Sequence, residues 1–158
     1  MHIVVGLWPM ALIFDLFSRT AAQNNPLVRL SFYSIGLGLV AVLPAVVTGV
    51  LDWSEIKKEK PAWKLGLYHM LLNLAVFGLF AGNFALRLKD WSHATSTRDL
   101  PLVLSLTGTA LLCFSAWLGG RMVYHYGIGV GRKSKKKWRG IAEAGGANVP
   151  EQNKKGAQ

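Results

Sequence analysis

The sequence is poor in charge, poorer still in acidic residues, and has a single cysteine. Only 16% of its 158 residues are charged, and eight acidic side chains stand against eighteen basic ones. So little charge beside a hydrophobic fraction of 51% is unusual for a soluble domain and is typical of a chain whose solvent is largely lipid. The single cysteine, Cys113, excludes an internal disulfide and a multi-cysteine metal or iron–sulfur site within one chain. Because Cys113 lies in an apolar run, we expect it to be a small buried side chain.

Two further patterns are missing. The N-terminal stretch does not look like a secretory signal peptide, because no basic segment precedes its apolar run and no small-residue cleavage site follows it. No nucleophile–base pair and no pair of carboxylates spaced for acid–base catalysis can be recognised, so the sequence does not favour an enzyme.

What the sequence does contain is four apolar segments, at residues 3–17, 30–53, 63–88 and 100–126. The last three are long enough to cross the ~30 Å hydrocarbon core of a bilayer. The first reaches only about 22 Å as a helix, so it crosses only if its polar ends lie in the headgroup layers. All four must be helical, since a lone strand would leave its backbone unpaired in lipid. We therefore expect an all-α membrane protein: a four-transmembrane-helix bundle with short loops over residues 1–130, followed by a basic, disordered, cytoplasmic tail over residues 131–158.

Lysine and arginine placement predicts the orientation of this bundle. Twelve basic residues lie on the side of the N-terminus, the second loop and the tail, and five lie on the other side. Basic residues concentrate in cytoplasmic segments, so both termini are expected in the cytoplasm. The tail sequence RKSKKKWR fits this role and could also attract anionic lipid. A single basic cluster without a nucleic-acid-binding fold argues against a nucleic-acid partner.

The expected topology places His69, His125 and their neighbours in the cytoplasmic leaflet. His69 and Asn73 share one helix face, and Arg121 and His125 share another, because each pair is four residues apart. One interpretation is a haem b between helices, with His69 and His125 as axial ligands, Arg121 at a propionate and Asn73 beside them.

Two other interpretations of the same leaflet remain open. His2 and Asp52 also lie there, so the histidines and Asp52 could bind a metal ion or a quinone head group. Alternatively, all of these residues are interfacial polar side chains that bond to the backbone or to one another. Spacing alone does not distinguish the three.

Two other features of the helices carry expectations. Asp15 is one turn from Arg19, so we expect these two side chains to pair; a proton-relay role for Asp15 has no visible partner chain. Gly78 and Gly82 form a small-xxx-small pattern that is suited to close helix packing.

Four motifs in order resemble a bacterial family of predicted small membrane proteins known as domain of unknown function 2231. HIVVGLWPMALIFDL resembles the family's opening motif, with His2, Pro9 and Asp15 at matching positions. TGVLDW, HMLLN and GGRMVYHYGIGV resemble three later motifs, and the likeness covers residues 2–130. The chain departs from the family by having Leu7 in place of a second histidine and Trp8 in place of a phenylalanine.

The resemblance implies a four-helix membrane domain in a bacterial inner (plasma) membrane. The family sometimes occurs fused to Rieske-type iron–sulfur domains, which points toward membrane redox chemistry. We therefore expect a non-catalytic membrane subunit or anchor that is redox-linked and binds haem b, in a membrane redox complex or a homo-oligomer. The alternatives are a small-solute or ion carrier, if Asp15, Asn73 and Asp52 line one path, and a purely structural partner subunit without a cofactor.

Overall fold

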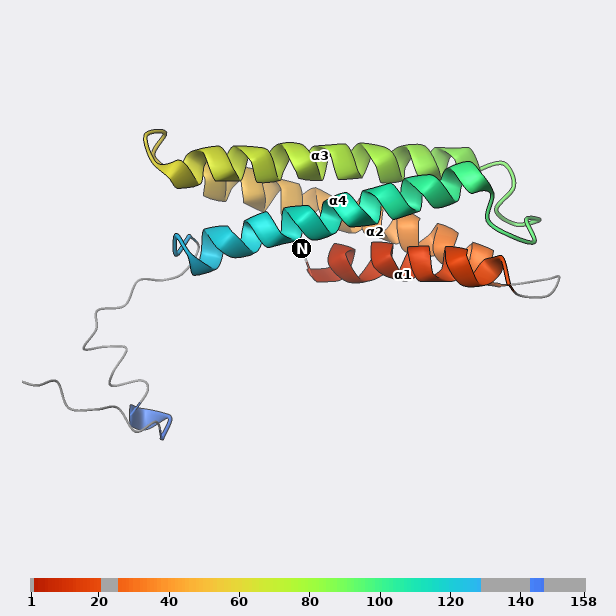
Figure 1. The fold of residues 1–158 in the computed structure, drawn as a ribbon, viewed down its shortest axis with the longest axis horizontal. Coiled ribbons are helices and arrows are strands. Elements are labelled where there is room, and N and C mark those ends of the chain that lie inside the picture. Colours follow the sequence, from red (N-terminus) through yellow and green to blue (C-terminus); the bar gives the residue numbers. More distant parts are fainter. Residues whose placement is uncertain (1, 21–25, 129–142, 147–158) are drawn as a thin grey trace, which may run out of the picture.

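The computed structural model describes residues 2–20, 26–128 and 143–146, and its fold is all-α, as predicted (Figure 1). The helices are α1 (His2–Ser18), α2 (Leu27–Ser54), α3 (Pro61–Arg87) and α4 (Asp99–Tyr124). No strand occurs among the described residues. α2, α3 and α4 are each long and apolar enough to cross a membrane, whereas α1 is a shorter apolar helix. The predicted basic tail lies almost wholly outside the described residues.

Local sequence signals explain the helix boundaries. Pro61 stands in the first turn of α3, where its missing N–H has no intrahelical acceptor to lose. Arg98 occupies the N-cap position of α4, and Asp99 is the first helical residue. Shortly beyond the end of α4, Gly127 adopts a φ of 63°, and its N–H bonds to the carbonyl of Val123.

The helices form two hairpins that pack into one bundle (Figure 1). α1 packs mainly on α2 and α3 mainly on α4, while narrower contacts between α2 and α3 and between α1 and α4 close the bundle. α1 ends, α2 begins, α3 ends and α4 begins at one end, hereafter the loop end. α2 ends, α3 begins and α4 ends at the other, hereafter the tail end. α1 covers only the part of the bundle nearer the loop end (Figure 1).

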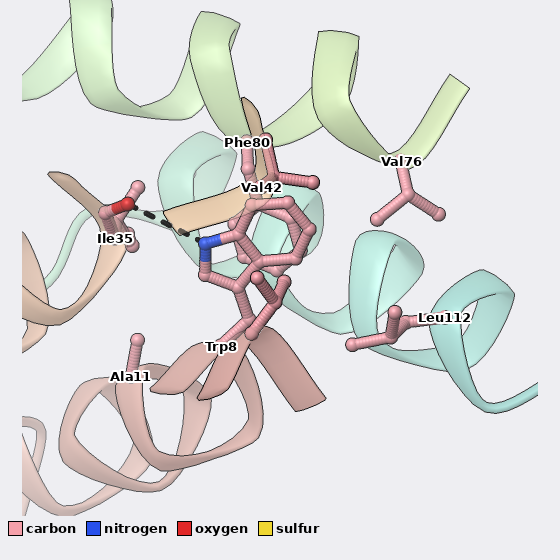
Figure 2. Packing of buried hydrophobic residues seen from close by; sticks show 8 residues of the cluster. Trp8, Ala11, Ile35, Val42, Val76, Phe80 and Leu112 are labelled. Atoms are coloured by element: carbon pink, nitrogen blue, oxygen red, sulfur yellow. Dashed lines mark hydrogen bonds between the residues drawn. The ribbon is translucent and has the colours of Figure 1, made fainter. Parts of the chain in front are cut away.

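A stacked aromatic pair fills the centre of the bundle (Figure 2). The rings of Trp8 and Phe80 lie 4.2 Å apart and nearly parallel, and both side chains are buried. Glycines make room for them: a Cβ on Gly38 would come within 2.2 Å of the Trp8 ring, and one on Gly108 within 2.7 Å of Phe80. The absence of these two side chains therefore sets how closely the helices approach.

The exterior of the bundle is mainly apolar, and one prediction is wrong there. Cys113 is exposed on α4 rather than buried. Gly78 and Gly82 face away from the other helices of this chain, because a Cβ at either position would meet nothing within 4 Å. Their small-residue pattern therefore does not serve packing within the bundle. An apolar exterior of this extent fits a surface that is surrounded by lipid.

Candidate functional site

A buried ion pair between Asp15 of α1 and Arg87 of α3 is the most polar feature of the bundle. The side chain of Asp15 is 0% exposed and that of Arg87 is 6% exposed. The pair is bidentate: Nη1 donates to Oδ1 at 2.8 Å and Nη2 donates to Oδ2 at 2.7 Å. Parallel bonds of this kind combine charge with fixed geometry, which makes them stronger than neutral hydrogen bonds.

Neighbouring side chains complete the hydrogen bonding of the pair. Arg87 Nε donates to Asn83 Oδ1 at 2.8 Å, Nη1 also donates to Ser31 Oγ at 3.0 Å, and Nη2 reaches Ser105 Oγ at 3.5 Å. All five N–H donors of the guanidinium are thus used. The carboxylate of Asp15 also accepts from Thr97 Oγ1 at 2.9 Å and from Ser105 Oγ at 2.7 Å. The Asp15–Arg87 cluster comprises Asp15, Ser31, Asn83, Arg87, Thr97 and Ser105.

The Asp15–Arg87 cluster joins every helix at the loop end. Its members come from α1, α2, α3, α4 and the loop between α3 and α4. Removing one partner of such a pair would leave a buried charge uncompensated, at a cost of about 3–5 kcal/mol. The arrangement is therefore suited to holding the helices together, and it leaves no donor of Arg87 unused for a ligand.

The expected pairing of Asp15 with Arg19 is wrong. Arg19 instead forms an ion pair with Asp99 and donates to the carbonyl of Thr97 at 3.1 Å. Helical spacing identifies only partners on the same helix, so it could not find Arg87, which is one of the five basic residues on the side opposite the termini. The signal that was available is the spacing of Asn83 and Arg87, four residues apart in the same apolar segment.

A second polar cluster surrounds His69, nearer the tail end. Nδ1 of His69 lies 2.8 Å from the carbonyl oxygen of Ser115 on α4, which can only accept, so this nitrogen carries the proton. Nε2 then accepts from Asn73 Nδ2 at 3.1 Å, and the same amide donates to the carbonyl of His69 at 2.9 Å. A Cβ on Gly119 would come within 3.0 Å of the imidazole. The ring of His69 therefore joins α3 to α4.

These contacts do not fit a haem held between His69 and His125. A ligating nitrogen needs a free lone pair, and the one on Nε2 of His69 is taken by Asn73. His125 also lies six residues beyond Gly119, roughly 9 Å further along α4. The structure thus brings His69 and Asn73 together and places His125 closer to the tail end. The haem that the sequence predicts between these two histidines therefore has no support in the described contacts.

Arg121 and His125 lie on the exposed surface at the end of α4. The guanidinium carbon of Arg121 is 5.2 Å from the centre of the Trp117 ring, as in a cation–π contact. The ring of His125 meets that of Tyr126 edge-on at 4.8 Å. Both polar side chains therefore lie beside interfacial aromatic rings, outside the His69 cluster.

The predicted metal site at His2 and Asp52 remains a prediction. Asp52 is exposed near the tail-end terminus of α2, and the side chain of His2 lies outside the described residues. Within the described part of the chain, no three His, Cys, Asp or Glu side chains gather closely enough to hold a metal ion.

An apolar layer separates the two polar clusters. It is formed by the buried side chains of Val4, Trp8, Ala11, Ile35, Val42, Val76, Phe80 and Leu112 (Figure 2). On α3, Val76 and Phe80 lie between Asn73 of one cluster and Asn83 of the other. A polar path along the bundle would have to pass through this layer.

Comparison with known proteins identifies a family for this chain. The family model described as predicted membrane protein (DUF2231) matches residues 1–132. No curated protein and no solved structure matches the chain significantly.

Proposed function

This chain belongs to the DUF2231 family of predicted membrane proteins, and we propose that it serves as a non-catalytic membrane subunit or anchor. Its apolar helices lie in a lipid bilayer. Within this proposal the bilayer is a bacterial inner membrane, and both termini are cytoplasmic. Arg87 is an ion-pair partner inside the bundle rather than a loop charge. It therefore no longer counts among the basic residues of the outer side, and the excess of basic residues on the side of the termini, which predicts this orientation, becomes larger.

The Asp15–Arg87 cluster is the observation that supports a structural role. Ionisable residues inside a membrane domain are often functional, and those of carriers and proton relays keep groups available for their cargo. Here the carboxylate accepts four hydrogen bonds and the guanidinium has no spare donor. Such saturation favours a rigid, pre-assembled bundle that presents surfaces to other molecules.

The same cluster supports α1 as the fourth membrane span. α1 has 17 residues and reaches about 25 Å as a helix, which is short for the hydrocarbon core. Asp15 and Ser18, near its end, bond to Thr97 beside the start of α4. This end of α1 therefore shares the depth of the ends of the longer helices, and the proposal takes α1 to cross with its N-terminus in the opposite headgroup layer.

An outward face of α3 supports a subunit rather than an isolated protein. Ala75, Gly78, Gly82 and Ala85 lie on this face and are all exposed. Small side chains let two membrane helices approach closely, and none of the other described helices packs against this face. The proposed partner is a transmembrane helix of a second copy or of another membrane protein.

The runner-up function, a small-solute or ion carrier, required Asp15, Asn73 and Asp52 to line one path. Asp15 lies at the loop end and Asp52 at the tail end, and the apolar layer around Trp8 and Phe80 lies between them. A carrier would have to open this layer in each cycle, so the proposed subunit role is favoured.

Reconstitution in liposomes separates the two functions. We expect liposomes that contain the purified protein to hold proton and potassium gradients as well as protein-free liposomes, with no change in Asp15→Asn. A leak that depends on Asp15 would overturn the proposal in favour of the carrier. Crosslinking in intact native membranes tests the subunit role directly. We expect one adduct of fixed mass, in which the chain is joined to its partner.

A further inference from the structure

An apolar groove runs between α3 and α4 on the outside of the bundle, at the level of the His69 cluster. Tyr68, Leu71 and Leu72 of α3 line it together with Phe114 and Leu118 of α4. This open groove has a volume of about 470 Å³, which is within the ~300–1,000 Å³ of ligand-binding clefts. The ring of Phe114 stacks on Trp117, which extends the aromatic surface toward the tail end.

Cationic side chains lie where this groove reaches the tail end. Lys64 is one turn before Tyr68 on α3, and therefore lies on the helix face that lines the groove. Arg121 and His125 follow Leu118 on α4 at helical spacing, and they continue the face of α4 that lines it. All three side chains are exposed. Gly66 of α3 lies beside Met122 of α4, since a Cβ on Gly66 would come within 3.2 Å of the Met122 methyl carbon. Lys64 and Arg121 therefore lie at similar depths.

The charge at this end of the groove is not balanced by nearby acids on the same helices. α3 contains no aspartate or glutamate, and the only one in α4 is Asp99, at the opposite end. Trp63, next to Lys64, accepts a hydrogen bond from Trp53 at 3.1 Å through its carbonyl. Because tryptophan rings concentrate at membrane interfaces, this pair marks the headgroup layer.

We propose that this groove binds an anionic phospholipid, with an acyl chain along Tyr68, Leu72 and Leu118 and the phosphate between Lys64 and Arg121. An acyl chain matches the apolar lining, and a phosphate matches two exposed cations at headgroup depth. Basic sites between transmembrane helices recognise anionic headgroups in this way. The cation–π contact with Trp117 holds the guanidinium of Arg121 at the membrane surface.

Lipid titration followed by native mass spectrometry tests the proposal. The delipidated protein in a neutral detergent is titrated with phosphatidylglycerol and, separately, with phosphatidylcholine. We expect one tightly bound phosphatidylglycerol per chain and weaker binding of phosphatidylcholine. Lys64→Gln and Arg121→Gln should each weaken phosphatidylglycerol binding about fivefold, since each cation near an anionic lipid contributes a similar factor. Leu72→Trp, which fills the groove, should weaken binding of both lipids.

Matched variants control for general effects. Lys89→Gln removes an exposed cation at the loop end, and Leu74→Trp adds bulk to an exposed position of α3 outside the groove. Both should bind phosphatidylglycerol as the unchanged protein does. Equal loss in these controls would overturn the proposal, as would equal affinity for the two lipids. It would also be overturned by a co-purified quinone or partner helix in the groove, or by displacement of the lipid with millimolar inorganic phosphate. Thermal unfolding of each variant confirms that the bundle remains folded.

Discussion

The guanidinium of Arg87 and the carboxylate of Asp15 meet through two parallel hydrogen bonds although they are 72 residues apart in the sequence. The side chain of Asp15 is 0% exposed and that of Arg87 only 6%. The pair fastens the end of α1 to the end of α3, and its serine, threonine and asparagine neighbours add α2, α4 and the following loop.

Arg87→Met should lower the free energy of unfolding by about 3–5 kcal/mol, because it leaves the carboxylate of Asp15 buried without its partner. The double change Asp15→Leu with Arg87→Met should recover much of this loss, since it removes both charges. Denaturant titration in mixed micelles measures the difference. Arg98→Met is the control: its ion pair with Asp90 is exposed and should contribute about 0–1 kcal/mol. A double variant no more stable than Arg87→Met would contradict this account.

Gly38→Ala should destabilise the bundle by about 1–3 kcal/mol, the usual cost of overpacking. The new methyl group would lie 2.2 Å from the indole nitrogen of Trp8, and the ring has little room because it stacks on Phe80. Gly49→Ala, on the same helix, meets nothing within 4 Å and provides the control. Thermal unfolding in detergent compares the two variants. Equal unfolding midpoints would contradict the prediction, because they would show that the Trp8 ring can shift without cost.

Gly82→Leu should leave the unfolding of the isolated chain nearly unchanged but weaken its assembly in the membrane. The position faces away from the bundle, and a leucine there would prevent another helix from approaching closely. Crosslinked adducts in native membranes report on assembly, and detergent unfolding reports on the fold. Gly108→Leu should instead destabilise the fold of the isolated chain, because its side chain would collide with Phe80. Full retention of the adducts in Gly82→Leu would exclude this face.

The purified protein, produced with ample haem supply, should show no Soret band. Nε2 of His69 accepts a hydrogen bond from Asn73, and His125 lies closer to the tail end. His69→Ala should instead destabilise the contact between α3 and α4 by about 0.6–2 kcal/mol, as expected for hydrogen bonds between membrane helices. A Soret band that disappears in both His69→Ala and His125→Ala would restore the haem interpretation, and would require the side chain of Asn73 to move.

A cysteine at Ser96 should react with a membrane-impermeant maleimide added outside intact cells, whereas a cysteine at Ser54 should react only after the membrane is opened. These positions lie at the loop end and the tail end, respectively. The labelling requires a Cys113→Ser background, because the native cysteine is exposed on α4. Reaction at position 54 from outside would reverse the proposed orientation.

The sequence by itself determined the helices. Long apolar runs interrupted by polar loops, with Pro61 at a helix start and glycines after Tyr126, predict four helices to within a few residues of those observed. These features are local, because backbone hydrogen bonding in lipid and the special conformations of proline and glycine act over a few neighbouring residues. The spacing of His69 and Asn73 likewise predicted a contact that the structure contains.

Only the tertiary structure decided which polar groups meet. Helical spacing paired Asp15 with Arg19, one turn away, but the carboxylate selects Arg87 because burial makes a saturated, bidentate partner far more favourable than an exposed one. The direction in which Gly82 and Cys113 face followed from helix rotation, which the nearly uniform hydrophobicity of these helices does not specify. In lipid, both faces of a helix can be apolar, so the choice depends on where Trp8, Phe80 and the glycines beside them fit together.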